Sequence, residues 1–188
     1  MTDPIQFGPW TSFVDSTGQA PNMTRLEDER TIQFQMDRLE LTIAGDSGPA
    51  AAAAVLSGGL DLTMPAQLDV AGLMLLVSGQ ITRTAGTQAQ VTAALGSTVR
   101  SVEFPQLAPA GTPTGEAAEG LTPDQLRPTT DFTVVCFLID QNPDAVGAPP
   151  FPPFPAVPIT VSMHARCRFP DEAAVMNVST MTVGVLLH

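Results

Sequence analysis

The chain has 188 residues and a formal net charge of −11, and its 8 Lys+Arg residues are all arginine. Binding to nucleic acid or to an anionic membrane surface depends on clustered basic side chains, so this charge argues against both as partners. The length is best explained by one domain with a real core, and 44% hydrophobic residues is normal for a globular protein.

The N-terminus has no recognisable targeting segment. Its opening residues, M-T-D-P-I-Q-F-G-P-W, hold an acid and prolines where a signal peptide needs basic and then apolar runs. The longest apolar run, residues 73–77, is far shorter than the ~20 residues that cross a membrane. We therefore expect synthesis in the cytoplasm without a signal peptide and no contact with membranes.

Residues 1–30 are predicted to form an N-terminal arm. The segment is rich in proline and glycine and follows neither helical nor strand periodicity. Its large apolar residues Phe7, Trp10 and Phe13 are typical of an extended terminus pinned onto a surface, of the same molecule or of a neighbour. We expect these three side chains to be assembly contacts.

Residues 31–43 are predicted to form a strand with a bulge. Apolar residues occupy even positions over 32–36 and odd positions over 39–43. One extra residue near 37–38 explains this change of phase. The turn-forming residues at 45–49 end the strand.

Several short strands are predicted in the next part of the chain. Apolar runs bounded by glycine or proline mark them, at residues 60–64, 68–77, 81–84, 90–95 and 99–104. The alanine run at 50–54 fits either a helical turn or the start of a strand.

Two long loops rich in proline and glycine are predicted, one on each side of a hydrophobic strand. The first, 105–130, contains one expected helical turn at 122–126, where threonine is the cap and proline follows it. The second, 141–158, should be extended because proline fixes φ and cannot donate to a β-ladder. The strand between them, 131–140, is apolar on both faces, which predicts the centre of a sheet.

Residues 159–169 have the clearest strand pattern in the chain. Every odd position is apolar or small and every even position is polar, so alternate side chains face opposite sides of a sheet. A closing strand with a bend near 177–179 follows at 175–188. About eight strands and almost no helix predict an all-β fold: residues 31–188 form a single antiparallel β-sandwich of jelly-roll-like form.

The cysteines and histidines are too few for a disulfide framework or an evident metal centre. Cys136 and Cys167 lie in strand patterns and are expected to be buried free thiols, although a pair between aligned strands stays open. His164 and Cys167 should point to opposite faces of one strand and cannot share an ion. No phosphate loop or dinucleotide fingerprint is present, so we expect no metal and no cofactor.

One short motif resembles catalytic loops. Asp46-Ser47-Gly48 resembles the active-site triplet of aspartic proteases, which implies a dimer with one Asp per chain. The same segment resembles the nucleophile loop of chymotrypsin-like proteases, but those enzymes need a histidine earlier in the chain, and the histidines here, His164 and His188, come later. An ordinary turn is the favoured interpretation.

Two surface features are candidate contacts. His164, Arg166 and Arg168 form a basic stripe for an anion or an acidic partner, although ion pairs with acids on neighbouring strands are the favoured interpretation. The proline-rich segment contains P-x-x-P spacing, yet a strap that packs Phe151 and Phe154 against a neighbouring copy is favoured.

Without a catalytic constellation, the sequence favours a non-enzymatic structural protein. We expect a homo-oligomer or a complex with other structural proteins, as in a self-associating shell, decoration or tail component of a virion. The alternative is a sandwich module that binds sugar or peptide. The second alternative is a dimeric aspartic protease that uses Asp46.

Overall fold

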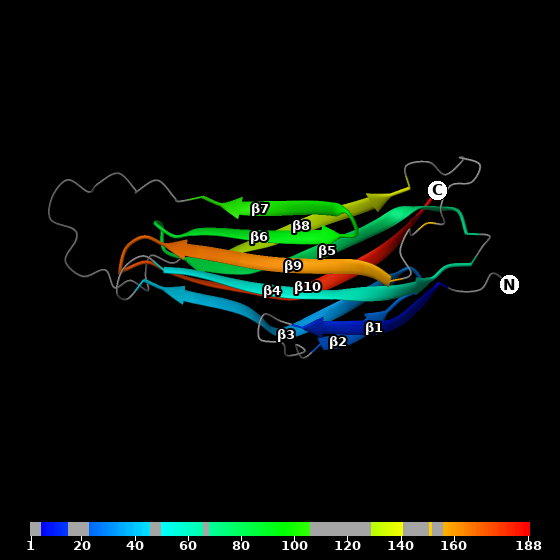
Figure 1. Ribbon diagram of the computed structural model, residues 1–188, viewed down its shortest axis with the longest axis horizontal. Helices are drawn as coiled ribbons and strands as arrows, with labels where there is room; N and C mark the ends of the chain where they lie inside the picture. The colour runs from blue at the N-terminus through cyan, green and yellow to red at the C-terminus, as the bar shows by residue number, and fades with distance from the viewer. Residues whose placement is uncertain are drawn as a thin grey trace.

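In a computed structural model of the chain we describe residues 5–14, 23–45, 50–65, 68–105, 129–140, 151 and 156–188, without the side chains of 9–14, 23, 37 and 38. These residues form strands and connecting turns (Figure 1). The strands are β1 (Gln6–Val14), β2 (Met23–Glu27), β3 (Thr31–Ala44), β4 (Ala50–Thr63), β5 (Val70–Arg83), β6 (Gln88–Leu95), β7 (Thr98–Phe104), β8 (Thr129–Ile139), β9 (Ala156–Cys167) and β10 (Ala173–Leu187).

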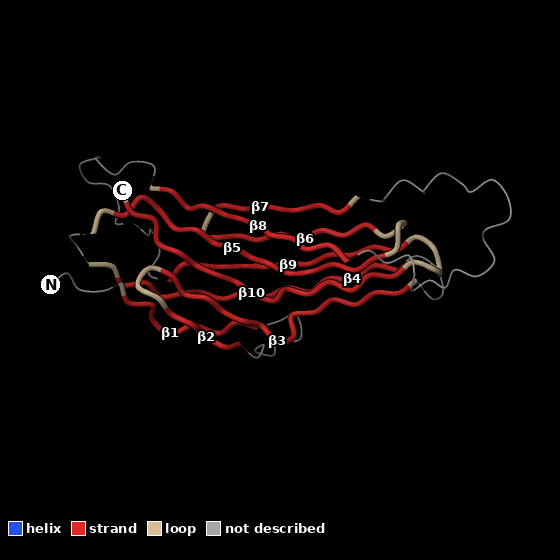
Figure 2. Tube along the Cα trace, turned by 180° about the vertical axis from the view of Figure 1, so that it is seen from behind, coloured by secondary structure: helices blue, strands red, loops and turns tan. Residues whose placement is uncertain are grey.

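The strands form two five-stranded antiparallel sheets that lie face to face. Sheet A has the order β1-β4-β9-β6-β7, and sheet B has the order β2-β3-β10-β5-β8. All strands run along the long axis of the molecule (Figure 2). The predicted antiparallel β-sandwich is confirmed, with ten strands among the described residues instead of about eight.

The strands from β3 through β10 are paired as in a jelly roll. β6 pairs with β7, β5 with β8, β4 with β9 and β3 with β10. The chain is therefore one long hairpin whose two arms are wound together and distributed over both sheets. Its closing turn is at Gly96, whose φ of 57° is a conformation that glycine adopts without strain.

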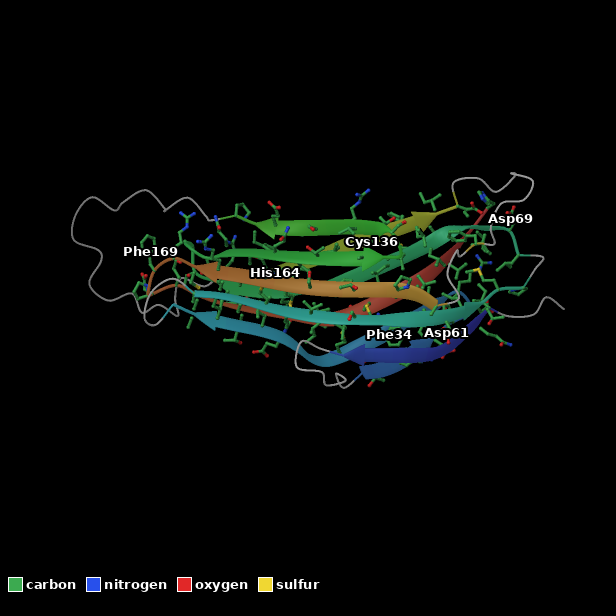
Figure 3. The ribbon with its side chains drawn as sticks, in the orientation of Figure 1. Phe34, Asp61, Asp69, Cys136, His164 and Phe169 are labelled. Atoms are coloured by element: carbon green, nitrogen blue, oxygen red, sulfur yellow. The ribbon has the colours of Figure 1, made fainter. Side chains whose placement is uncertain are left out.

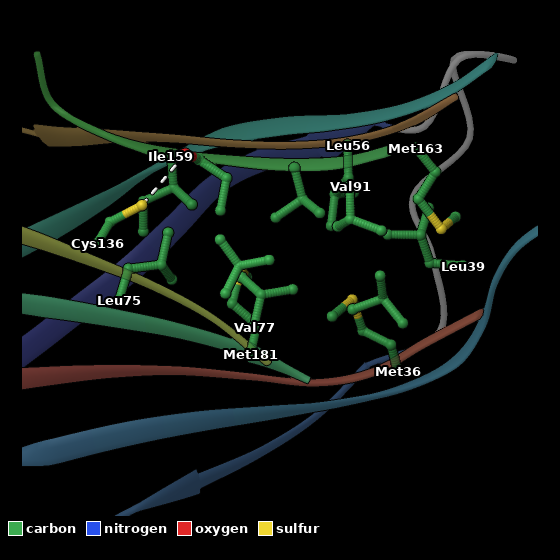
Figure 4. Packing of buried hydrophobic residues seen from close by; sticks show 14 of the residues in the cluster. Met36, Leu39, Leu56, Leu75, Val77, Val91, Cys136, Ile159, Met163 and Met181 are labelled. Carbon is green, nitrogen blue, oxygen red and sulfur yellow. Dashed lines mark hydrogen bonds between the residues drawn. The ribbon is translucent and has the colours of Figure 1, made fainter. Parts of the chain in front are cut away.

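The core lies between the two sheets and follows from the period-two patterns. On β9 the odd residues from Val157 to Cys167 are buried, while His164 and Arg166 face outward. Methionine and branched aliphatic side chains from both sheets meet in the interior (Figure 4). The predicted alternation is thereby confirmed over 159–167, whereas Phe169 lies beyond β9 and is 59% exposed.

The predicted bulge in β3 is present, with two extra residues relative to β10 instead of the one expected. Leu39 pairs with Val178 and Gln35 with Thr180, so residues 36–38 of β3 face the single residue Ser179 of β10. Met36 and Leu39 are both buried despite the change of phase. The irregular pairing keeps the apolar face inward on both sides of the bulge.

Two described segments of the predicted N-terminal arm, β1 and β2, are instead strands of the sandwich. β1 pairs with β4 at the edge of sheet A, and β2 pairs with β3 at the edge of sheet B. Phe7 is only 8% exposed and belongs to the core. Irregular register between Phe7 and Trp10 spans Pro9, and such an edge-strand irregularity hides the period-two pattern.

The hydrophobic strand over 131–140 was predicted at the centre of a sheet, and this is wrong. It forms β8, which is the edge strand of sheet B and pairs only with β5 among the described strands. Its inner side chains fill the core, while Phe137 and Ile139 on its outer face are exposed. An apolar outer face therefore marks an uncovered surface here and not a buried strand.

Other expectations have mixed outcomes. The alanine run begins β4, and the predicted strands at 68–77 and 81–84 are one strand, β5. Phe151 is partly buried and packs against the core. The helical turn at 122–126 and Phe154 lie outside the described residues. Within the described part of the chain no helix could cross a membrane.

Candidate functional site

Buried polar side chains close one end of the sandwich. Arg83 Nη1 donates to the carbonyl oxygens of Thr87 at 2.6 Å, Phe104 at 3.2 Å and Pro105 at 2.8 Å. Burial lowers the pKa of its guanidinium. Thr87 Oγ1 in turn donates to the Ala173 carbonyl at 3.2 Å. These bonds join strand ends from both sheets, so the cluster stabilises the fold.

Glu172 holds the turn between β9 and β10 at the same end. Its buried carboxylate accepts hydrogen bonds from the backbone N–H groups of Arg168 and Phe169, the latter at 3.1 Å. A Cβ at Gly86 would lie 1.7 Å from Glu172 Oε1. The hydrogen bonds of the turn therefore hold the carboxylate in place, and only glycine at position 86 leaves room for it.

The two thiols are structural. Cys136 and Cys167 are free and buried, and burial raises the pKa of both. Cys136 Sγ donates to the Ala93 carbonyl at 3.1 Å. A nucleophilic cysteine needs an accessible thiolate, and neither residue has this environment.

The remaining catalytic and metal expectations are settled only in part. His164 is exposed and Cys167 is buried, so they lie on opposite faces of β9 as predicted. Among the residues that can be described, no three His, Cys, Asp or Glu side chains converge as metal ligands. The Asp46-Ser47-Gly48 motif lies outside the described residues.

The outer face of sheet A carries a groove of ≈ 580 Å³. Two rows of cross-strand neighbours form its floor: Ala51–Arg166–Gln88 and Ala53–His164–Gln90, from β4, β9 and β6. Glu103, Phe104 and Pro105 of β7 and its end complete the lining on the far side. Because alanine side chains are short, the floor of the groove is low beside the two basic side chains. Figure 3 shows His164 on this face.

Among the described residues, His164 and Arg166 do not form the ion pairs with neighbouring strands that the sequence favoured for the basic stripe. The cross-strand neighbours of Arg166 and His164 are alanine and glutamine. Neither side chain pairs with a carboxylate of the described residues. Arg168 follows the end of β9, and it is not part of the groove lining. The structure therefore brings two members of the stripe together and leaves the third aside.

The outer face of sheet B is divided into a polar half and an apolar half. In the polar half, hydrogen bonds join neighbours on β5 and β8: Gln80 Nε2 donates to Asp131 at 2.9 Å, and Thr82 and Thr129 hydroxyls lie 2.9 Å apart. Ser78 and Thr133 hydroxyls are 3.2 Å apart. These polar side chains satisfy one another.

The apolar half, here called the sheet B patch, occupies the other end of the same strands. Its cross-strand pairs on β5 and β8 are Leu76–Val135, Met74–Phe137 and Gly72–Ile139. On β10, Thr182, Gly184 and Leu186 continue these rows. Phe137 is 44% exposed and Ile139 is 59% exposed. The rows hold no charged side chain.

Of the predicted assembly residues, Phe7 and Phe151 do not form this surface. Phe7 and Phe151 pack against the core of their own subunit, while the side chains of Trp10 and Phe13, and all of Phe154, lie outside the described residues. Sequence reasoning missed Phe137 and Ile139, although the signal was present: residues on both faces of 131–140 are apolar. It also missed Gln88 and Gln90, which alternate with Ala89 as outward residues of a strand should.

Comparisons with known proteins place the chain in no family. No model of a protein family and no curated protein matches it. Among solved structures, it is similar to TmCBM61 in complex with β-1,4-galactotriose, with TM-score 0.34 and 9% identity over 97% of this chain and 91% of that one. It is also similar to the xylan-binding module CBM15, with TM-score 0.30 and 13% identity over 98% and 97%. At these TM-scores neither similarity supports an argument about function.

Proposed function

We propose that this protein is a non-enzymatic structural protein that self-associates, with a second copy of the chain seated on the sheet B patch. One observation carries the proposal: Phe137 and Ile139 are 44% and 59% exposed within rows that contain no charge. Single exposed apolar residues are ordinary on protein surfaces. A contiguous apolar surface marks a site of interaction.

A second copy fits this surface by charge and by shape. Each chain carries a net charge of −11, so two copies repel one another, and this repulsion is smallest when the surfaces in contact lack charged groups. A two-fold axis would place the same patch on both sides of the interface. Stacking of one sheet on another is also how the two sheets of each subunit pack.

The available area supports a weak contact. Fully burying a large apolar side chain is worth about 1.5–3 kcal/mol, so the exposed halves of Phe137 and Ile139 contribute about 1–3 kcal/mol per protomer. With the partly exposed Met74, Leu76, Val135 and Leu186, two patches contribute about 8 kcal/mol before association costs of at least ~4 kcal/mol. About 4 kcal/mol remains after these costs, so the expected dissociation constant is about 1 mM.

The test is self-association of the wild type and of Phe137→Thr/Ile139→Thr. Threonine retains strand propensity and removes most of the apolar surface. Translational diffusion and rotational correlation times by NMR are measured between about 0.1 and 3 mM, which brackets the expected constant. The diffusion of the wild type should slow as its concentration rises, and the double variant should stay monomeric. Added salt should strengthen association, because it screens the repulsion between acidic copies.

Two other exposed apolar residues supply matched controls. Val99 lies on β7 of sheet A. Phe169 lies in the β9–β10 turn, at the opposite end of the molecule from Asp69, which directly precedes β5 and its part of the sheet B patch (Figure 3). Val99→Thr and Phe169→Thr should associate like the wild type. A wild-type protein that remains monomeric at 1 mM, or equal weakening by the control variants, would contradict the proposal.

A further inference from the structure

We propose that the groove on the outer face of sheet A is a binding site for an extended acidic peptide. Arg166 and His164 would contact carboxylates of every second ligand residue, while Gln88 and Gln90 would contact the ligand's main chain. The site is on the opposite sheet from the sheet B patch, so it does not depend on self-association.

The spacing of the groove matches that of an extended chain. Arg166 and His164 are two residues apart on β9, and Gln88 and Gln90 are two residues apart on β6. Residues two apart on a strand are separated by about 6.6 Å. An extended peptide that runs along the strands presents alternate side chains at the same interval, so two ligand carboxylates align with the two basic side chains.

The charges in the groove select an acidic ligand and its position. A guanidinium binds carboxylates with paired, charge-assisted hydrogen bonds, and Arg166 has no carboxylate partner among the residues described. Glu103 lies on the opposite side and accepts from Gln90 Nε2 at 3.4 Å. Its negative charge repels acidic groups from β7 and directs them toward β9 and the low alanine edge of β4.

The described lining favours a peptide over a glycan. Phe104 of the lining is 8% exposed, and the centroid of its ring lies 6.0 Å from the centroid of the Phe132 ring. It therefore offers no open ring face on which a sugar could stack. Amide and guanidinium groups instead match the carbonyls and carboxylates of a peptide.

The experiment compares three probes by NMR titration at low salt. The first is a synthetic peptide that alternates threonine and glutamate, the second replaces its glutamates with glutamine, and the third is an oligogalacturonate. The acidic peptide should shift the amide signals of β6 and β9, and raised salt should weaken its binding. The glutamine peptide should bind at least about tenfold more weakly, as expected for loss of charge-assisted bonds.

Three exposed positions provide the variants. Arg166→Gln should weaken the acidic peptide about tenfold, while Glu103→Gln should strengthen binding because it removes a like charge. Arg30→Gln, an exposed position between β2 and β3 of sheet B, should leave the affinity within about twofold, as for a distant screened charge. Equal binding of the two peptides, an unaffected Arg166→Gln variant, or binding of the oligogalacturonate without the peptide would each overturn the proposal.

Discussion

The contact between Gly86 and Glu172 predicts a strongly non-additive pair of substitutions. In Gly86→Ala the new methyl carbon would lie 1.7 Å from Glu172 Oε1 and 2.6 Å from its carboxyl carbon. A flexible side chain could usually move aside. Here the same carboxylate accepts the N–H groups of Arg168 and Phe169, so moving it breaks both bonds.

The magnitude follows from those two hydrogen bonds. A hydrogen bond to a charged group contributes about 1.5–3 kcal/mol, and these two are partly buried. Gly86→Ala and Glu172→Ala should therefore each lower the free energy of unfolding by about 2–4 kcal/mol. The double variant lacks the carboxylate with which the methyl group collides. It should therefore be no less stable than Glu172→Ala alone, giving a coupling energy of about 2–4 kcal/mol.

Urea unfolding followed by circular dichroism measures this cycle. With a slope of about 2 kcal/mol per molar urea, each single substitution should lower the midpoint by about 1–2 M. Asp171→Ala, an exposed acid in the same turn, is the control and should change the free energy by less than about 0.5 kcal/mol. Additive losses in the double variant would refute the account of this turn.

Other consequences of the fold can be measured in the same way. Deleting residues 1–14 should destabilise the subunit and not release folded monomers, because β1 pairs with β4; Phe7→Ala alone should cost about 3–5 kcal/mol in urea unfolding. A truncated protein with an unchanged midpoint would show that β1 is dispensable. Cys136 and Cys167 should resist a thiol reagent at pH 8 in the native protein and react once it is unfolded. Because burial raises both thiol pKa values, the contribution of the two thiols to the free energy of unfolding should be constant below their unfolded pKa of about 8.5 and fall as pH rises above it. Rapid labelling of the native protein, or stability that rises over this range, would contradict their burial.

Local periodicity predicted most of the strands because each inner face is apolar. The change of phase in β3 located the bulge, and the alternation over 159–169 separated the inner and outer residues of β9 correctly. These features depend on side chains close together in the chain. The order of the strands depends on pairings between distant segments, such as β3 with β10, and no local pattern contains that information.

The candidate surfaces were harder to predict for the same reason. The sequence identified His164 and Arg166, but their neighbours Ala53 and Gln88 come from strands more than seventy residues away in the chain. The sheet B patch was visible only as excess hydrophobicity in 131–140. That excess has two explanations, a central strand or an uncovered edge, and only the position of β8 in sheet B distinguishes them.

The most direct test of self-association is an isotope-filtered nuclear Overhauser measurement on a mixture of labelled and unlabelled protein near 1 mM, where the weak contact should be populated. Self-association through the sheet B patch predicts intermolecular contacts among methyl groups of Met74, Leu76 and Ile139 and the ring of Phe137. Signals from Val99 or Phe169 should show none. Intermolecular contacts confined to other surfaces, or none at this concentration, would contradict the central claim.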